Sequence, residues 1–177
     1  MFELKKMRLE RNYTLEMLAS ATGFTKGYLS KIERSPTLPP FATVQRIAEA
    51  LQFDIADLFS DKKEIFESHN IDIVKHAELE EQTDVYSFFP LLNSYRNKQM
   101  APFLFTVKTG ATELTTHDSE EFVFVIEGCI ELNYEDATYH LEKGDAFYLD
   151  ARIAHNFVNR QESTASLLAV HFNYRRF

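Results

Sequence analysis

Four residues in the second half of the chain have types and a spacing that suit metal binding: Thr115, His117, Glu121 and His155. Residues an even number of positions apart share one face of a strand, so the first three can point the same way and His155 can arrive from a later strand. Two imidazoles and a carboxylate form the ligand set of many non-haem iron sites. The pattern predicts a metal site at His117, Glu121 and His155. The same side chains would also suit a polar pocket in which they hydrogen-bond one another or a small ligand without an ion.

A second group of residues, near the N-terminus, has the chemistry needed to bind DNA. Lysine and arginine recur between positions 26 and 34 together with hydroxyl side chains. Cationic and hydroxyl groups contact phosphates, and lysine or arginine can also donate hydrogen bonds to base edges in the major groove. The candidate DNA-binding residues are Thr25, Lys26, Tyr28, Ser30, Lys31 and Arg34.

The element that must position this second group is a pair of short helices joined by a tight turn. Thr14 is a good N-cap, and Gly23 stands where the end of a helix favours a left-handed residue. Thr25 can cap the next helix, whose apolar stripe includes Leu29 and Ile32. Two such helices form a helix-turn-helix, whose second helix lies in the major groove of DNA.

Three further helices are expected to complete the N-terminal unit. A proline-marked loop at residues 35–40 precedes a helix over residues 41–51, and a short fifth helix follows over Ile55–Phe59. The first helix covers about Phe2–Arg11, with Leu4, Met7 and Leu9 toward the core and Lys5, Lys6, Arg8 and Arg11 toward solvent.

Residues 3–59 resemble the phage-repressor-like family of bacterial DNA-binding domains, also called the Cro-type or xenobiotic-response-element family. The segments that carry the resemblance are LKKMRLERNYTLEMLA, GFTKGYLSKIER and PPFATVQRIAEALQFDIADLF. The resemblance implies a five-helix, DNA-binding domain over residues 1–60. Two positions depart from the family, because Leu15 stands where Gln is frequent and Ser35 stands where Gly is expected after the recognition helix.

After a charged segment at residues 60–70, the chain changes to short strands of β-branched and aromatic residues. Turn signals such as Glu127-Gly128 and Lys143-Gly144 separate them, and no helical pattern interrupts them. This arrangement predicts an all-β sandwich or barrel. The expected strands are Ile71–Val74, Val85–Pro90, Ala101–Val107, Phe122–Ile126, Cys129–Tyr134, Ala137–Leu141, Ala146–Leu149, His155–Val158 and Ala165–Phe172.

Residues 85–173 resemble the cupin superfamily in both of its signature segments. These segments are Thr115-x-His117-x3-Glu121-x6-Gly128 and Gly144-x5-Asp150-x-Arg152-x2-His155-x3-Asn159. The resemblance implies a jelly-roll barrel, or double-stranded β-helix, over residues 85–177, after a linker and leading strand at 61–84. Carried over by position, His117, Glu121 and His155 fall on three of the family's four ligand positions, and Thr115 replaces the remaining histidine. Asp150 and Arg152 stand where Pro and Gly are common in the family.

The predicted pocket extends beyond the metal ligands, and any ion in it would be divalent: Zn, Fe, Ni or Mn. Tyr86, Phe88 and Phe105 are further candidates for its walls, and Arg152 either meets an anionic effector or lies exposed. The predicted effector-binding residues are Thr115, His117, Glu121, Phe124, Tyr148, Arg152 and His155. The remaining histidines have no partner at a metal-binding spacing and are expected to be ordinary side chains: His69, His76, His140 and His171. His171 is also a candidate for the pocket wall.

The charge of the chain is unevenly distributed. The formal net charge is -8, yet residues 1–46 carry +4 and residues 61–177 carry -9. This asymmetry favours a DNA-binding head on an acidic body, because phosphate binding depends on the local basic surface. Apolar runs are shorter than the roughly 20 residues of a bilayer span and no signal segment follows Met1, so a soluble, cytoplasmic protein is expected. The single cysteine, Cys129, excludes an internal disulfide and argues against a cysteine-based zinc site.

Together these features predict a transcriptional regulator. It would act as a homodimer on a pseudo-palindromic operator in double-stranded DNA, and its cupin domain would sense a small-molecule effector. The alternative is a cupin metalloenzyme with non-haem iron, epoxidase-like or dioxygenase-like, because a cupin epoxidase shares the order of domains and the His-x3-Glu…His ligand pattern. The cationic helix with Lys26, Lys31 and Arg34 favours the regulator, since an enzyme has no need to keep it.

Overall fold

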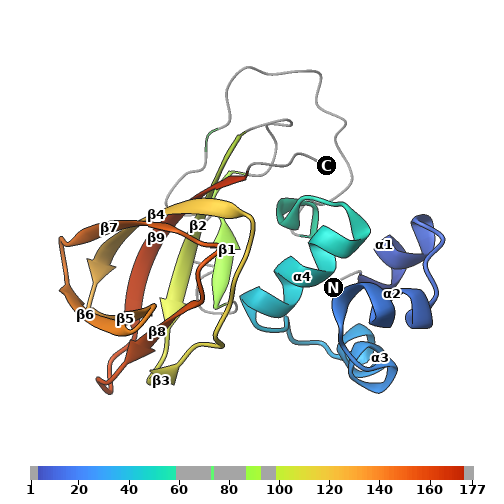
Figure 1. The fold of residues 1–177 in the computed structure, drawn as a ribbon, viewed down its shortest axis with the longest axis horizontal. Coiled ribbons are helices and arrows are strands. Elements are labelled where there is room, and N and C mark those ends of the chain that lie inside the picture. Colours follow the sequence, from blue (N-terminus) through green and yellow to red (C-terminus); the bar gives the residue numbers. More distant parts are fainter. Residues whose placement is uncertain (1–3, 59–72, 74–86, 93–98, 174–177) are drawn as a thin grey trace. The chain divides into compact units, whose positions relative to one another are not determined.

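A computed structural model of the protein describes residues 4–58, 73, 87–92 and 99–173. These residues belong to two compact units, one within residues 1–63 and the other within residues 64–176. The first unit is helical and the second is built from strands (Figure 1), as the predicted α + β organisation requires. The predicted linker over residues 61–84 lies outside the described residues except at Ile73, as do His69, His76 and Tyr86, so the domain boundaries stay predictions.

The helical unit has four α-helices and one 3-10 helix among its described residues, so the prediction of five α-helices is wrong. Gln52 ends the fourth helix in a left-handed conformation with φ 56°. After Phe53 and Asp54, the four residues Ile55–Leu58 form a 3-10 helix, a form that usually occurs in such short pieces. The elements are α1 (Leu4–Glu10), α2 (Leu15–Thr22), α3 (Lys26–Arg34), α4 (Phe41–Leu51) and η1 (Ile55–Leu58).

Local capping fixes the turn between α2 and α3, and the caps predicted from the sequence are confirmed. The Thr14 hydroxyl accepts a hydrogen bond from the amide of Met17, which starts α2. Gly23 ends α2 at φ 72°, a left-handed conformation that costs glycine little. The Thr25 hydroxyl then accepts from the amide of Tyr28 and starts α3 at once. The direction of α3 is therefore set by residues within the turn itself.

The first helix departs from the sequence prediction in two side chains. Leu9, expected in the core, is 54% exposed, whereas Arg8, expected in solvent, is 6% exposed. Arg8 Nε donates to Glu33 Oε1 at 2.6 Å, and its Nη1 donates to the carbonyl of Tyr13 at 2.6 Å. A charge can lie inside because these partners replace its lost water. This ion pair ties α1 to the end of α3, alongside the apolar core of Leu4, Met7, Leu18, Leu29, Ile32, Ile47, Ala48, Leu51 and Phe53.

The second unit contains two antiparallel sheets. The five-stranded sheet has the order β1-β2-β9-β4-β7, and the four-stranded sheet has the order β3-β8-β5-β6. One short strand, β3, was not expected from the sequence. The strands are β1 (Phe88–Pro90), β2 (Met100–Val107), β3 (Gly110–Ala111), β4 (Ser119–Glu127), β5 (Cys129–Tyr134), β6 (Ala137–Glu142), β7 (Ala146–Asp150), β8 (His155–Asn159) and β9 (Ala165–Asn173).

The prediction of a closed barrel is wrong for the part of the chain that the structure describes, because the strands form two separate sheets. One apolar core contains side chains from both sheets, including Val125 of β4, Leu167 of β9 and Leu132 of β5. The strands alternate accordingly: along β4, Glu121, Val123 and Val125 are buried while Phe122, Phe124 and Ile126 are exposed. Two sheets that share one interior define the unit as a sandwich.

Replacing Arg8 by alanine is expected to destabilise the helical unit by roughly 3 kcal/mol, because the loss of one partner leaves the other charge of a buried pair unpaired. Urea unfolding of the full chain, followed by its helical circular dichroism signal, measures the change. Lys26→Ala is the matched control, since it removes an exposed ion pair with Glu16 and should leave the unfolding midpoint nearly unchanged. Equal midpoints for the two variants would contradict this expectation.

Candidate functional site

The strand unit contains a buried cluster of one carboxylate and three imidazoles. Glu121 Oε1 lies 2.7 Å from His117 Nε2 and 3.2 Å from His171 Nε2. Glu121 Oε2 lies 3.8 Å from His155 Nε2. All four residues are 5% exposed or less. The structure thus brings together the three predicted ligands His117, Glu121 and His155, and it adds His171.

Each member of this cluster is positioned by the backbone. Glu121 lies on the inner face of β4 and is the direct register partner of His171 on β9. His155 begins β8 in the other sheet, and its amide and carbonyl bridge those of Thr115. His117 precedes β4, where its amide donates to the carbonyl of Ala151 at 2.8 Å. The cluster therefore spans both sheets at one end of the sandwich.

The charge state of the cluster follows from burial and from contact among its members. Burial alone would raise the pKa of the Glu121 carboxyl, but the imidazoles of His171, His117 and His155 outweigh it and lower that pKa to about 2. Burial lowers the pKa of His171 to about 4 and also lowers the pKa of His155. At neutral pH the site therefore holds a carboxylate beside two uncharged imidazoles at His155 and His171. Uncharged imidazole and carboxylate are the forms that bind metal ions.

The hydrogen bonds around the cluster test whether it suits an ion. His155 Nδ1 lies 2.8 Å from the carbonyl of Ile153, which can only accept, so Nδ1 carries the proton and Nε2 presents a lone pair. His117 Nδ1 shares a 2.6 Å hydrogen bond with the Ser119 hydroxyl. His117 Nε2 is buried and has no hydrogen bond assigned to it among the described residues, although it lies 2.7 Å from Glu121 Oε1. A metal site requires ligand side chains that are oriented by hydrogen bonds from their other ring nitrogen and that point toward one position. The cluster meets this requirement and could hold a metal.

Three residues predicted to bind the effector lie away from this cluster. Phe124 is three positions after Glu121 on β4, an odd separation, so it lies on the opposite, exposed face. Tyr148 is 64% exposed and donates a hydrogen bond to Glu120. Arg152 is exposed and donates through Nε and Nη2 to Asp150, at 2.8 Å and 2.6 Å. This contact lowers the pKa of Asp150 to about 2.

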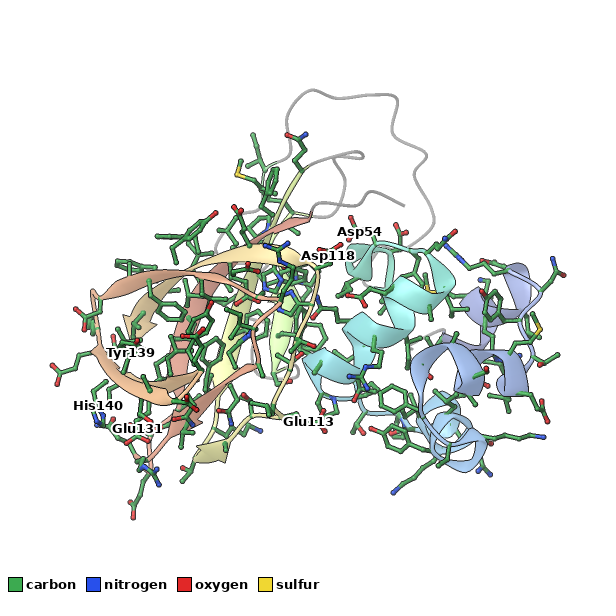
Figure 2. The ribbon with its side chains drawn as sticks, viewed as in Figure 1. Asp54, Glu113, Asp118, Glu131, Tyr139 and His140 are labelled. Atoms are coloured by element: carbon green, nitrogen blue, oxygen red, sulfur yellow. The ribbon has the colours of Figure 1, made fainter. Side chains whose placement is uncertain are left out.

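The sequence interpretation named His171 only as a candidate for the pocket wall and did not predict its position beside Glu121. The signal was the alternation of β9, where Ala165, Leu167 and Ala169 are buried and His171 continues the same face. Its ring stacks on His117 and on Phe105, which was predicted as part of the pocket wall. The other described histidine outside the motif, His140, is 76% exposed and lies 3.6 Å from Glu131 in the outer strands (Figure 2).

A second candidate site is the exposed side of α3 in the helical unit. Leu29 and Ile32 are buried, while Lys26, Lys31 and Arg34 are exposed. The acidic residue of this helix, Glu33, is withdrawn into the pair with Arg8, so the exposed side of α3 is cationic. The predicted DNA-binding residues on this side are Thr25, Lys26, Tyr28, Ser30, Lys31 and Arg34, of which Ser30 is half-buried and the others are exposed.

Two neighbouring features complete this surface. Lys26 forms an ion pair with Glu16 of α2, which places one carboxylate beside the start of α3. The Tyr28 ring packs edge-on against Phe24 in the turn at 5.2 Å, and the Arg46 guanidinium of α4 lies 5.4 Å from the centre of the same Phe24 ring. Arg46 was not among the predicted contacts, yet it adds a cation next to the turn.

The family comparisons match both units. A helix-turn-helix family model matches residues 4–58, and a cupin domain model matches residues 103–171. None of the helices among the described residues is long and apolar enough to cross a membrane.

Named relatives match nearly the whole chain. The HTH-type transcriptional regulator PuuR of Escherichia coli (strain K12) is 24% identical over 170 residues, which cover 95% of this chain and 91% of that protein. The HTH-type transcriptional regulator SutR of the same organism is 29% identical over 177 residues, 96% of this chain and 89% of that protein. The crystal structure of an HTH_3 family transcriptional regulator from Vibrio cholerae has a TM-score of 0.70 at 19% identity, covers 98% of this chain and 94% of its own, and has the same fold.

Proposed function

We propose that this chain, in which a helix-turn-helix domain precedes a cupin domain, is a transcriptional regulator that acts in the cytoplasm as a homodimer on operator DNA. The cupin domain senses a small-molecule effector. The observation that carries the proposal is the cationic, exposed side of α3, directly after a capped turn, in a chain whose relatives are named regulators.

The exposed side of α3 is the DNA-reading surface in this proposal. Lys26, Tyr28 and Lys31 reach base edges in the major groove, while Arg34 and the hydroxyls of Thr25 and Ser30, with nearby amides, contact phosphates. Glu33 does not oppose this binding, because Arg8 neutralises it inside the unit. The acidic composition of residues 61–177 does not oppose it either, since phosphate binding follows the local charge.

A homodimer follows from the small size of this surface. One recognition helix reads only a few base pairs, so two helix-turn-helix units on a pseudo-palindromic operator are needed for useful specificity. Their half-sites are expected about one helical turn of DNA apart.

The buried cluster is the sensing end in this proposal. One divalent ion (Zn, Fe, Ni or Mn) is held by His117, Glu121 and His155, and an effector with oxygen or nitrogen donors binds next to it, near Thr115. Phe124, Tyr148 and Arg152 are left out of this pocket because they lie on other faces. The effector shifts DNA affinity only if it binds the two dimer arrangements with different affinity.

A second candidate function is a mononuclear non-haem metal enzyme. The observation in its favour is the donor set itself, since two imidazoles and a carboxylate leave coordination positions open for a substrate. Sequence-specific DNA binding by the purified protein separates the two candidates, because a metal enzyme has no use for a cationic recognition helix.

Replacing Lys31 by alanine is expected to weaken operator binding by roughly 1–3 kcal/mol if Lys31 contacts a base. Fluorescence anisotropy with the DNA upstream of the protein's own gene measures the affinity. Lys143→Ala is the matched control, because it removes an equal charge from an exposed ion pair with Glu127 in the strand unit. Wild-type affinity should fall steeply with salt, as counterion release requires. If the wild-type protein bound none of the upstream DNA fragments, the proposal that it is a transcriptional regulator would be refuted.

Replacing Glu121 by glutamine is expected to abolish stoichiometric metal binding, because it removes the carboxylate at the centre of the cluster without changing its volume. Elemental analysis of protein purified from metal-supplemented medium gives the bound metal per chain. Glu127→Gln, which changes an exposed carboxylate on the same strand, is the control. Equal metal contents in the two variants, or none in the wild type, would argue against a metal site at Glu121.

A further inference from the structure

We propose that His171 is a metal ligand, so that the buried cluster is a three-imidazole, one-carboxylate site formed by His117, Glu121, His155 and His171. This inference rests on the proposed divalent-metal site and changes its ligand set. With three nitrogen donors the site suits an ion such as zinc or ferrous iron rather than magnesium or calcium, which prefer oxygen donors.

The register of the sheet places His171 beside the carboxylate. Residues directly opposite each other on neighbouring antiparallel strands point to the same face. Glu121 of β4 and His171 of β9 are such a pair, and both side chains face the interior. Ligation by His171 therefore requires no change in strand pairing.

The interatomic distances fit a shared ion. Two ligands bound at roughly 2.0–2.2 Å to one ion lie at most about 4.4 Å apart. The Nε2 atom of His117 lies 2.7 Å from a Glu121 carboxylate oxygen. The same distance is 3.8 Å for His155 and 3.2 Å for His171. The ligand atoms of His117, Glu121 and His171 all lie within 4.8 Å of one another, so small side-chain rotations suffice to bring them onto one ion.

Neighbouring aromatic rings pack around the ring of His171. His171 stacks on His117 at 5.1 Å and 7°, and on Phe105 at 6.2 Å and 3°. Phe103 meets it edge-on at 5.3 Å. These contacts keep His171 Nε2 near Glu121, and because an imidazole binds an ion in its own ring plane, one of the two parallel rings turns when His117 and His171 bind the same ion. His171 would thus supply the third imidazole, which Thr115 cannot provide.

A positioning role is the alternative for His171. In that case it would only hold Glu121 through the 3.2 Å contact, and a bound ion would have two imidazole ligands. The number of imidazoles on the ion separates the two roles, because a residue outside the coordination sphere does not contribute to it.

Zinc K-edge X-ray absorption of the tag-free, zinc-loaded full chain counts these imidazoles. We expect three in the wild-type protein and two in His171→Ala, with zinc affinity lowered about 100-fold or more by the substitution. The loss of an outer hydrogen-bond partner costs only about 10- to 100-fold. His140→Ala, which removes an exposed histidine on β6, is the matched control and should change neither the count nor the affinity.

Each result decides between the possibilities. If zinc had two imidazole ligands both in the wild-type protein and in His171→Ala, His171 would not be a ligand, and the proposed metal site would still stand. A wild-type protein that binds no zinc, iron, nickel or manganese would overturn both. If His171→Ala does not fold, as judged by its thermal melt, the wild-type count and His171→Gln, which keeps the side-chain volume, still decide the question.

Discussion

A carboxylate buried between two packed sheets is the constraint on which the cupin domain depends. An ionised group in an apolar interior is costly unless polar partners surround it, and three imidazoles lie within 3.8 Å of the Glu121 carboxylate. Strands β4, β8 and β9 and the segment before β4 must therefore meet at one end of the sandwich. The rest of the interior, around Val123 and Leu167, is apolar and gives the strands the rigidity that a defined site needs.

Local features of the fold could be predicted from the sequence, and features that depend on distant partners could not. The caps at Thr14 and Thr25 were predicted because each involves residues within one turn of helix. The burial of Arg8 depends on Glu33, 25 positions later, and the role of His171 depends on pairing with β4, so neither was predicted. Phe124 was misplaced although its odd separation from Glu121 already excluded a shared face.

The two units use charge in opposite ways. In the helical unit the Arg8–Glu33 ion pair is buried, so the exposed charged side chains of α3 are those of lysine and arginine. Among the described residues of the strand unit the buried charge is the Glu121 carboxylate, and exposed pairs such as Arg152 with Asp150 neutralise each other at the surface. A net charge of -8 for the chain therefore coexists with a locally cationic surface suited to DNA.

The pairing of Glu121 with His171 has a consequence for the order of events during synthesis. Strand β9 lies between β2 and β4 in its sheet, yet it comes last along the chain among the described strands. A nascent chain that lacks β9 leaves β4 paired with β7 alone and leaves Glu121 without its register partner His171. The four side chains of the cluster can thus come together only after β9 has been made and has inserted between β2 and β4.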